Sequence, residues 1–323
     1  MREKASQSGA ALVFAIFAVA TVVSLALAAS VAARGRIARV ASRIDRAALR
    51  DAAENALVLA LRKIEADTNA VDCLSEPWAL DSVAAAEALA AGGDGVFVTV
   101  SDERARLGVP DCGEKTLAAL LSLASGLDAA SAAGLAHASL PEAPVPPSGP
   151  ASPAGPASPS GPASPTSPAS PSSRLPCEEF LLAGQIGSAD RAALLAAMPF
   201  LSASAGAAFN VNTAPRPVVV AAALGGGATP GGAEGLWLRL EMARRRGDVF
   251  ASASPAEAMK LLRGEGDVPT SEELEALSLV QPFLRVDSGL FRVESTARRG
   301  RLSATVACVY ERGTGRIFRW TSR

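Results

Sequence analysis

The stretch AALVFAIFAVATVVSLALAASVAA occupies residues 10–33 and decides how the rest of the chain is arranged. It contains no charged residue, and its only polar side chains are those of Thr21, Ser24 and Ser30. As a helix rising about 1.5 Å per residue it would be about 36 Å long, which exceeds the ~30 Å hydrocarbon core of a bilayer. The stretch therefore predicts a transmembrane helix.

A helical pattern continues beyond this stretch, over residues 34–66. Apolar side chains recur at three- and four-residue steps from Ile37 through Ile44 to Ile64, which places them on one face of a helix. We therefore expect the apolar rod to continue as an amphipathic one.

The N-terminal region admits more than one interpretation. A secretory signal peptide has an apolar core of only about 7–15 residues before its cleavage site, and the present run is longer. Two interpretations remain: a simple membrane anchor, and a leader that is removed by processing. Five arginines over residues 34–46 outnumber Arg2 and Lys4, so the positive-inside rule does not favour a cytoplasmic leader.

The junction QSG followed by AALVF resembles the processing site of type IV prepilins, which a dedicated peptidase cuts after a glycine on the cytoplasmic side. Here the cut would follow Gly9 and leave Ala10 as the new N-terminus. Most pilins carry glutamate at the fifth mature position, where this chain has Phe14. The lack of that glutamate is similar to the general secretion pathway protein K family of type II secretion minor pseudopilins. We follow this resemblance, and not the charge rule, in placing the C-terminal part outside the cytoplasm.

A block around Trp78 is similar to the same family, in which a tryptophan follows the long helix in a D-x-L-x-E-x-W setting. We expect a helix to stop at Pro77 and Trp78. An indole has a large apolar body with one polar N–H, so we interpret Trp78 as a core anchor and not as a recognition residue.

A predicted strand over residues 96–100 leads into another family-like block, V-x-V-x-D-E-x-x-R-L. Its members are Val98, Val100, Asp102, Glu103, Arg106 and Leu107. The family continues with an N-x-N pair, which residues 108–111 lack. Adjacent carboxylates such as Asp102 and Glu103 can serve catalysis or bind a metal, but no histidine or second carboxylate cluster accompanies them. We therefore expect a solvated acidic turn.

The middle of the chain combines predicted helices with a low-complexity insertion. Residues 114–140 are rich in alanine and leucine, with breaks at Gly126 and Gly134. Residues 141–173 repeat a P-A-S-P-like unit with too few apolar side chains to offset the entropy of ordering, so we expect an extended, mobile spacer. A proline-rich ligand for an aromatic groove is the less favoured alternative.

The most specific internal block consists of Asn210, Asn212, Thr213, Ala214 and Pro215. It matches an N-x-N-T-A-P signature that precedes a helix, and a glycine turn and a second predicted helix follow it. The unit resembles the helix-hairpin-helix module of the K-type pseudopilins and of competence proteins that hold DNA. Arginines over residues 244–246 and 298–301 could contact phosphate, but acidic residues flank the module. We expect a solvated or protein-facing surface and no nucleic acid, with DNA handling as the alternative function.

The C-terminal residues predict a capped helix from Ser271 and then an antiparallel meander of strands. The fold class is α+β: a pilin-like transmembrane helix, a C-terminal antiparallel sheet, and an inserted helical lobe of helix-hairpin-helix or SAM-like type. The expected segments are a leader at 1–9, the transmembrane helix at 10–33, its extension at 34–66, the start of the globular part at 67–113, the lobe at 114–140 and 174–208, the insertion at 141–173, the helix-hairpin-helix module at 209–270, and the closing helix and strands at 271–323.

Composition excludes several classes of protein. The 323 residues are 49% hydrophobic with a net charge of −1, which leaves room for an anchor and two compact units but does not indicate a basic nucleic-acid binder. His137 is the only histidine, and neither a G-x-S-x-G motif nor a Gly-Lys-Ser phosphate loop is present. We expect a protein that is not an enzyme.

The sequence assigns no residues to a metal site. The four cysteines form no C-x-x-C pair and one histidine offers little for zinc. Cys112 and Cys177 flank the insertion and are the pair to test as a disulfide. Calcium stays open, because some relatives with this architecture bind it, but the acidic residues are too scattered in the sequence to assign ligands.

The resemblance implies a minor pseudopilin that caps the tip of a secretion pseudopilus and starts its assembly. It implies a single-pass inner-membrane protein with its globular part in the periplasm. The implied partners are other minor pseudopilins, the prepilin peptidase, and secreted cargo or the outer-membrane channel. A generic anchored adaptor remains a further alternative.

We predict that Gly9→Leu leaves uncut precursor, because the peptidase of this resemblance requires the glycine before the cut. Mass spectrometry of the N-terminus from membranes measures it. A natural protein that is intact from Met1, in cells that contain the peptidase, would contradict the prepilin interpretation and leave the simple anchor.

Overall fold

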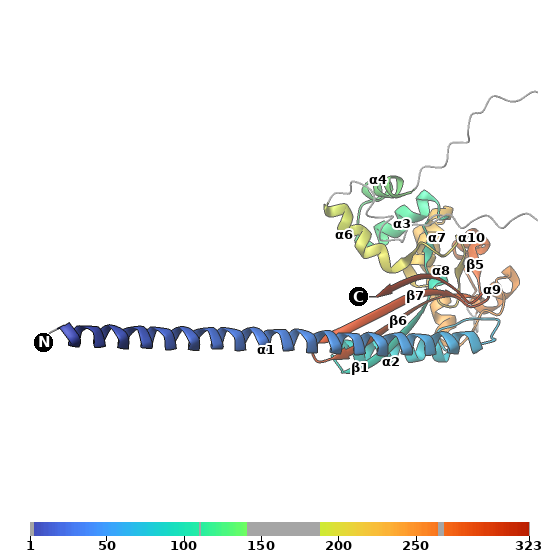
Figure 1. The fold of residues 1–323 in the computed structure, drawn as a ribbon. Helices are drawn as coiled ribbons and strands as arrows, with labels where there is room; N and C mark the ends of the chain where they lie inside the picture. The colour runs from blue at the N-terminus through green and yellow to red at the C-terminus, as the bar shows by residue number, and fades with distance from the viewer. Residues whose placement is uncertain (1–2, 110, 141–187, 264–267, 323) are drawn as a thin grey trace, which may run out of the picture.

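A single helix, α1 (Glu3–Ala66), carries the rest of the chain at its C-terminal end (Figure 1). The computed structural model describes residues 3–109, 111–140, 188–263 and 268–322. It confirms the α+β class: a long apolar helix, an antiparallel sheet and a helical lobe. The predicted spacer and Cys177 lie outside the described residues.

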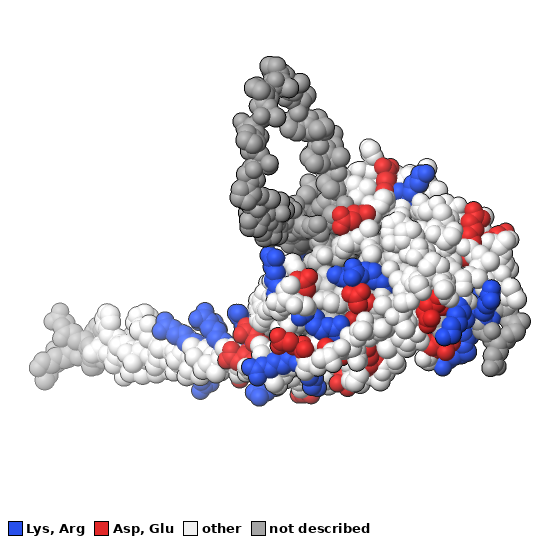
Figure 2. All heavy atoms as spheres, turned by 90° about the vertical axis from the view of Figure 1, so that its right-hand side faces the viewer, with Lys and Arg blue, Asp and Glu red and all other residues white. Residues whose placement is uncertain are grey.

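The two halves of α1 lie in different surroundings. From Leu12 to Val31 every large apolar side chain is exposed, and the helix is long and apolar enough to cross a membrane. In Figure 2 the white part of the rod next to its grey end carries no charge colour, and charged side chains begin where the rod approaches the globular part. The second half buries Leu49, Ala53 and Leu57 against the sheet. One continuous helix therefore joins a lipid-compatible segment to a protein core.

The sheet has four antiparallel strands in the order β1-β6-β7-β8. Their bounds are β1 (Gly95–Asp102), β6 (Leu290–Arg299), β7 (Leu302–Glu311) and β8 (Arg316–Ser322). Alternate residues of β6 and β7, among them Phe291, Val293 and Cys308, point toward α1, as the period of two in a strand requires. The predicted meander is thus present, with β1 added along its free side.

Helix α2 (Pro77–Ala90) follows a ten-residue loop after α1 and covers β1. Our expectation that a helix stops at Pro77 is wrong, because α1 already ends at Ala66 and Pro77 begins the next helix. Proline suits the first helical turn, where its missing N–H would have no partner in any case. Trp78 thereby faces the sheet, with its ring edge on Phe291 at a centroid distance of 5.5 Å.

The helical lobe occupies the chain between β1 and β6 and has its own core. Its elements are η1 (Glu103–Ala105), β2 (Leu107–Gly108), α3 (Glu114–Ser125), α4 (Ala129–Ser139), α6 (Ser188–Ala197), η2 (Met198–Phe200), β3 (Leu201–Ser202), β4 (Phe209–Asn210), α7 (Arg216–Gly226), α8 (Pro230–Arg245), α9 (Pro255–Arg263), α10 (Ser271–Val280), η3 (Gln281–Phe283) and β5 (Leu284–Arg285). In Figure 1 the lobe lies above the sheet and α1 lies below it. The lobe core is therefore distinct from the core between α1 and the sheet.

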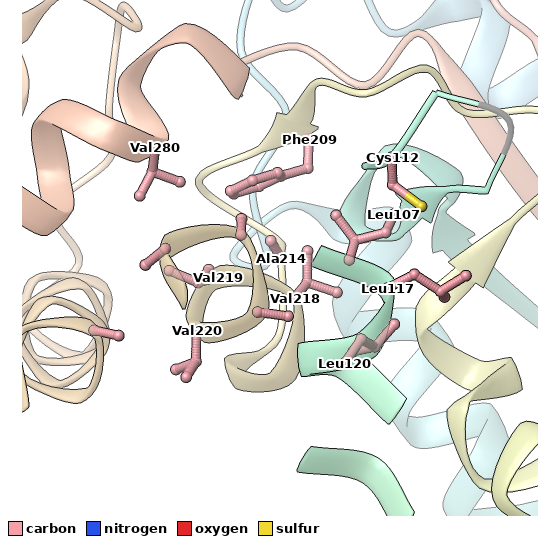
Figure 3. Close-up of a cluster of buried hydrophobic side chains, with 14 of the residues drawn as sticks. Leu107, Cys112, Leu117, Leu120, Phe209, Ala214, Val218, Val219, Val220 and Val280 are labelled. Carbon is pink, nitrogen blue, oxygen red and sulfur yellow. The ribbon is translucent and has the colours of Figure 1, made fainter. Parts of the chain in front are cut away.

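Helix α7 lies at the centre of the lobe. Figure 3 shows Val218 directed toward Leu117 and Leu120 of α3, with Val280 of α10 on the other side of α7. The helices approach closely, since a Cβ on Gly225 would lie 2.1 Å from the hydroxyl oxygen of Thr116. The N-x-N-T-A-P block thus leads directly into the most buried helix of the lobe.

The α7–α8 hairpin and the start of α10 follow the expected turn chemistry. Gly227 ends α7 in the left-handed region, with φ of 105°, where a side chain would be strained. Thr270 caps α10 in a capping box with Glu273, as the predicted helix start at Ser271 requires. Buried Arg239 of α8 then pairs with Glu273 at 2.7 Å, which joins the two helices.

We predict that Leu57→Ala lowers the free energy of unfolding of the globular part by about 2–5 kcal/mol, because the side chain is fully buried between α1 and the sheet. Leu59→Ala is the matched control, because Leu59 is 62% exposed two residues away. Denaturant unfolding of the full chain in detergent, followed by tryptophan fluorescence, measures both. Equal losses in the two variants would contradict the packing of α1 on the sheet.

Candidate functional site

Residues predicted separately from the D-E block and the N-x-N-T-A-P block meet at the junction between sheet and lobe. Asp102 ends β1, and Asn210 ends β4. The side-chain amide nitrogen of Asn210 lies 3.0 Å from a carboxylate oxygen of Asp102, across 108 positions of sequence. The contact joins the sheet to the lobe, so we treat this junction as the candidate functional site.

Asp102 is a buried carboxylate whose hydrogen-bond donors are uncharged groups. Besides Asn210, the hydroxyl of Thr213 donates to it, and the backbone N–H of Arg104 donates at 2.7 Å. Burial raises the pKa of Asp102 above its ordinary value, although these hydrogen bonds oppose the shift. The carboxyl group holds the first turn of the lobe on the last residue of β1.

Glu103, the next residue, is buried together with a cationic partner. Both of its oxygens accept hydrogen bonds from Arg292 of β6 at 3.0 Å, and one also accepts from Ser202 at 2.7 Å. Burial alone would raise the pKa of Glu103, but Arg292, Arg106 and Ser202 outweigh it, and the pKa lies below its ordinary value. Two adjacent carboxyl groups therefore have opposite pKa shifts.

The expected solvated turn at Asp102 and Glu103 is wrong, since their exposed fractions are 4% and 1%. The lobe folds back over the end of β1 and supplies Thr213 and Ser202, while β6 supplies Arg292. These partners lie about 100 to 190 positions away in the chain. No local pattern could reveal the burial.

The two asparagines of the block have different roles. The amide nitrogen of Asn210 also lies 3.0 Å from the Asp72 carbonyl and 2.9 Å from the Ser288 hydroxyl. The amide of Asn212 exchanges two hydrogen bonds with the backbone of Phe250, as a strand neighbour would. Asn210 thus connects lobe and sheet, and Asn212 closes the lobe on itself.

The last residues of the block position α7. Pro215 is the N-cap of that helix. Arg244 of α8 donates to the carbonyls of Ala214 and Val211, and its guanidinium lies 5.1 Å from the ring centre of Trp237. Burial lowers the pKa of Arg244 to about 10.

The arginine run at 244–246 therefore serves the lobe itself. Arg244 binds backbone carbonyls, Arg245 pairs with Glu241 at 2.9 Å, and Arg246 pairs with Asp248 at 2.9 Å. A phosphate-binding surface needs cations directed into solvent, and acidic partners neutralise two of these three. The structure therefore does not favour the DNA-handling alternative.

The core-anchor interpretation of Trp78 agrees with its contacts. Its indole N–H donates to Glu76, and its ring packs edge-on against Phe291. Glu76 belongs to a group of carboxylates with Asp67 and Asp72, whose ligand atoms all lie within 4.8 Å of one another. Sequence reasoning missed this group, although the loop 67–76 contains all three acids within ten residues.

The remaining predicted residues lie away from the junction. Gly9, Ala10 and Phe14 belong to α1, with the Phe14 side chain exposed. Burial raises the pKa of the Cys112 thiol to about 11, and its pairing with Cys177 stays a prediction because Cys177 is not described.

His137 also lies elsewhere, exposed on α4, with Nδ1 3.3 Å from the carboxylate of Glu114. The junction itself is built from carboxylates, amides and guanidinium groups that bind one another. Such an arrangement fixes the position of the lobe.

Comparison with known proteins supports the fold. The sequence matches neither a protein-family profile nor a curated protein. The structure is similar to a chain of the crystal structure of the GspK-GspI-GspJ complex from the enterotoxigenic Escherichia coli Type 2 Secretion System, with a TM-score of 0.55 and 14% identity. The match covers 88% of this chain and 99% of that chain. The predicted GspK-like architecture is confirmed.

We predict that Glu103→Gln lowers the free energy of unfolding by about 3 kcal/mol at neutral pH, because it leaves Arg292 without its buried counter-charge. The folded pKa of Glu103 is depressed, so the stability it contributes is present above the unfolded pKa of about 4.3 and is lost as pH falls through the folded pKa. The gap between wild type and variant should therefore narrow in acid. Denaturant unfolding of the full chain at several pH values measures it.

Asp102→Asn is the matched comparison, because the pKa of Asp102 is raised. The stability that Asp102 contributes is fully present below its unfolded pKa and is lost as pH rises through its folded pKa. The free energy of unfolding of Asp102→Asn, relative to that of wild type, should therefore rise with pH. The same pH slope in both variants would contradict the two environments described for these residues.

Proposed function

We propose that this chain is a minor pseudopilin of a type II secretion system, related to the general secretion pathway protein K family. The observation that carries the proposal is one helix that is apolar and exposed in its first half and packed on a sheet with an inserted lobe in its second. A similar chain forms part of the GspK-GspI-GspJ complex. The proposal includes an inner-membrane anchor, a periplasmic globular part and no enzymatic activity.

Part of α1 beyond the apolar stretch is suited to packing against other subunits. Ile37, Val40 and Ile44 are 69%, 54% and 63% exposed. Ile44 and Ala53 are about two and a half helical turns apart, which puts them on opposite faces of α1. Ala53 is buried on the sheet, so this apolar stripe faces away from the chain's own core. Our expectation of a single apolar face from Ile37 to Ile64 is wrong, because Ile64 is buried on the sheet side. We assign the exposed stripe to helices of other minor pseudopilins.

Phe14 supports a place at the tip of the assembly. In a pilus-like bundle the glutamate at the fifth mature position of one subunit neutralises the N-terminal amine of the subunit before it. A charge without a partner in lipid costs roughly 2.5–3.5 kcal/mol, so a subunit that lacks this glutamate is poorly suited to follow another. Its own amine at Ala10 can still be neutralised by the next subunit. The chain would therefore precede all others and start assembly.

The lobe supports the same place. It lies at the C-terminal end of α1 (Figure 1), where it would obstruct a further subunit stacked beyond that end. At a tip it would face outward, toward secreted cargo or the outer-membrane channel. Processing by the prepilin peptidase at Gly9 precedes this assembly.

We predict that crosslinkable cysteines placed between Val13 and Val23 capture pseudopilin neighbours on one side only. Phe14→Glu should add capture on the second side, because the new carboxylate can neutralise a preceding amine. Phe17→Glu is the control, because it adds the same charge about one helical turn further along, away from the N-terminal amine of a preceding subunit. Mass spectrometry of crosslinks in membranes identifies the neighbours.

Two outcomes would contradict the tip assignment. One is the capture of wild-type neighbours both above and below the chain. The other is the formation of long filaments by this subunit alone. Crosslinks to no pseudopilin at all would contradict the broader proposal.

A further inference from the structure

The loop between α1 and α2 gathers three acids around one arginine. Asp67, Asp72 and Glu76 place their ligand atoms within 4.8 Å of one another, a spacing that would suit a divalent cation. Among the described residues this is the group of three that could hold a metal ion. The guanidinium of Arg312, from the turn after β7, reaches into it.

Arg312 binds the group as a fork. Its two terminal nitrogens each donate to one oxygen of Asp72 at 3.0 Å, and one of them lies 3.5 Å from Asp67. Planar guanidinium matches a carboxylate with two parallel bonds, which an ammonium cannot do. Asp72 is fully buried, so its charge needs a partner inside the protein.

The three carboxylates also accept hydrogen bonds from donors other than Arg312. The backbone N–H of Ser288 donates to Asp72 at 2.6 Å, and that of Asn69 donates to Asp67 at 3.0 Å. Glu76 accepts from the indole of Trp78 and, at 3.5 Å, from the side chain of Asn69. Calcium takes six to eight oxygen ligands at about 2.3–2.6 Å, whereas here each carboxylate oxygen of the group already lies beside a hydrogen-bond donor or the Arg312 cation. The group therefore does not fit calcium.

The rest of Arg312 is fixed as well. Its backbone N–H donates to the carbonyl of Gly289 at 2.8 Å, and its guanidinium lies 5.4 Å from the ring centre of Phe291. The side chain is only 15% exposed. Both ends of the arginine are therefore held, and the cation cannot swing out to admit an ion without breaking these contacts.

We infer that Arg312 is a built-in cation that takes the position of a divalent metal in the Asp67, Asp72 and Glu76 group, so that this part of the junction is held without calcium. Because Asn210 contacts the Asp72 carbonyl, the arginine also supports the attachment of the lobe. Removing the guanidinium should expose a metal site that the wild-type chain does not offer.

Terbium is a suitable probe, because it binds calcium ligands and emits when a nearby tryptophan is excited. Trp78 contacts Glu76 and would act as the antenna. The full chain in detergent is compared with Arg312→Gln, which removes the charge, and Arg312→Lys, which keeps it. Arg316→Ala is the control for loss of an arginine on the neighbouring strand. Trp78→Phe removes the antenna and Asp72→Asn removes a carboxylate of the group. Emission that disappears in both variants comes from this group.

We expect terbium emission through Trp78 in Arg312→Gln and none in wild type, Arg312→Lys or Arg316→Ala. Calcium should leave the thermal midpoint of wild type unchanged relative to chelator and raise that of Arg312→Gln. An Arg312→Gln chain that folds only with calcium would support the inference equally.

Two results would overturn it. The first is wild-type emission, or calcium stabilisation, that disappears in Asp72→Asn and Trp78→Phe, since the native group would then hold a metal. The second is an Arg312→Gln chain that takes up no terbium when folded, or stays unfolded in calcium, since a metal could not then replace the guanidinium.

Discussion

The hydrogen bonds of the Asn210 side chain are the interaction on which the rest of the structure depends. Its amide nitrogen lies within 3.0 Å of groups from the loop after α1, the end of β1 and the segment before β6. Each of these belongs to a different part of the pilin-like body, while Asn210 itself belongs to the lobe. Buried donors and acceptors are costly without partners, so the four segments can share only one arrangement.

A second constraint acts on α1, whose two halves have different surroundings. Residues 10–33 of the helix carry no charge and are almost entirely apolar, which is compatible with lipid, and its second half buries one face on the sheet. Movement of the helix relative to the sheet would expose Leu57 and its neighbours. The sheet and lobe are therefore held at a fixed position relative to the exposed apolar segment of α1.

Local patterns in the sequence predicted the elements but not the junction. The apolar run, the strands of the meander and the capped start of α10 each depend on neighbours in sequence, and all are present. The burial of Glu103 depends on Arg292, and the role of Asp72 depends on Arg312, 240 positions away. Pairings of this range leave no periodic signal. The sequence therefore did not predict that the two blocks would meet.

The position of β6 beside β1 has a consequence for how the chain folds. Thr99 and Glu294 are neighbours in the sheet but lie 195 positions apart, so the lobe is in effect the loop of a very large hairpin. Closing so long a loop has an entropic cost that falls once its ends are brought together. A folded lobe does this, because Asp102 and Phe291 leave and re-enter the sheet as paired residues. We therefore expect the lobe to fold first and the pairing of β1 with β6 to complete the sheet last.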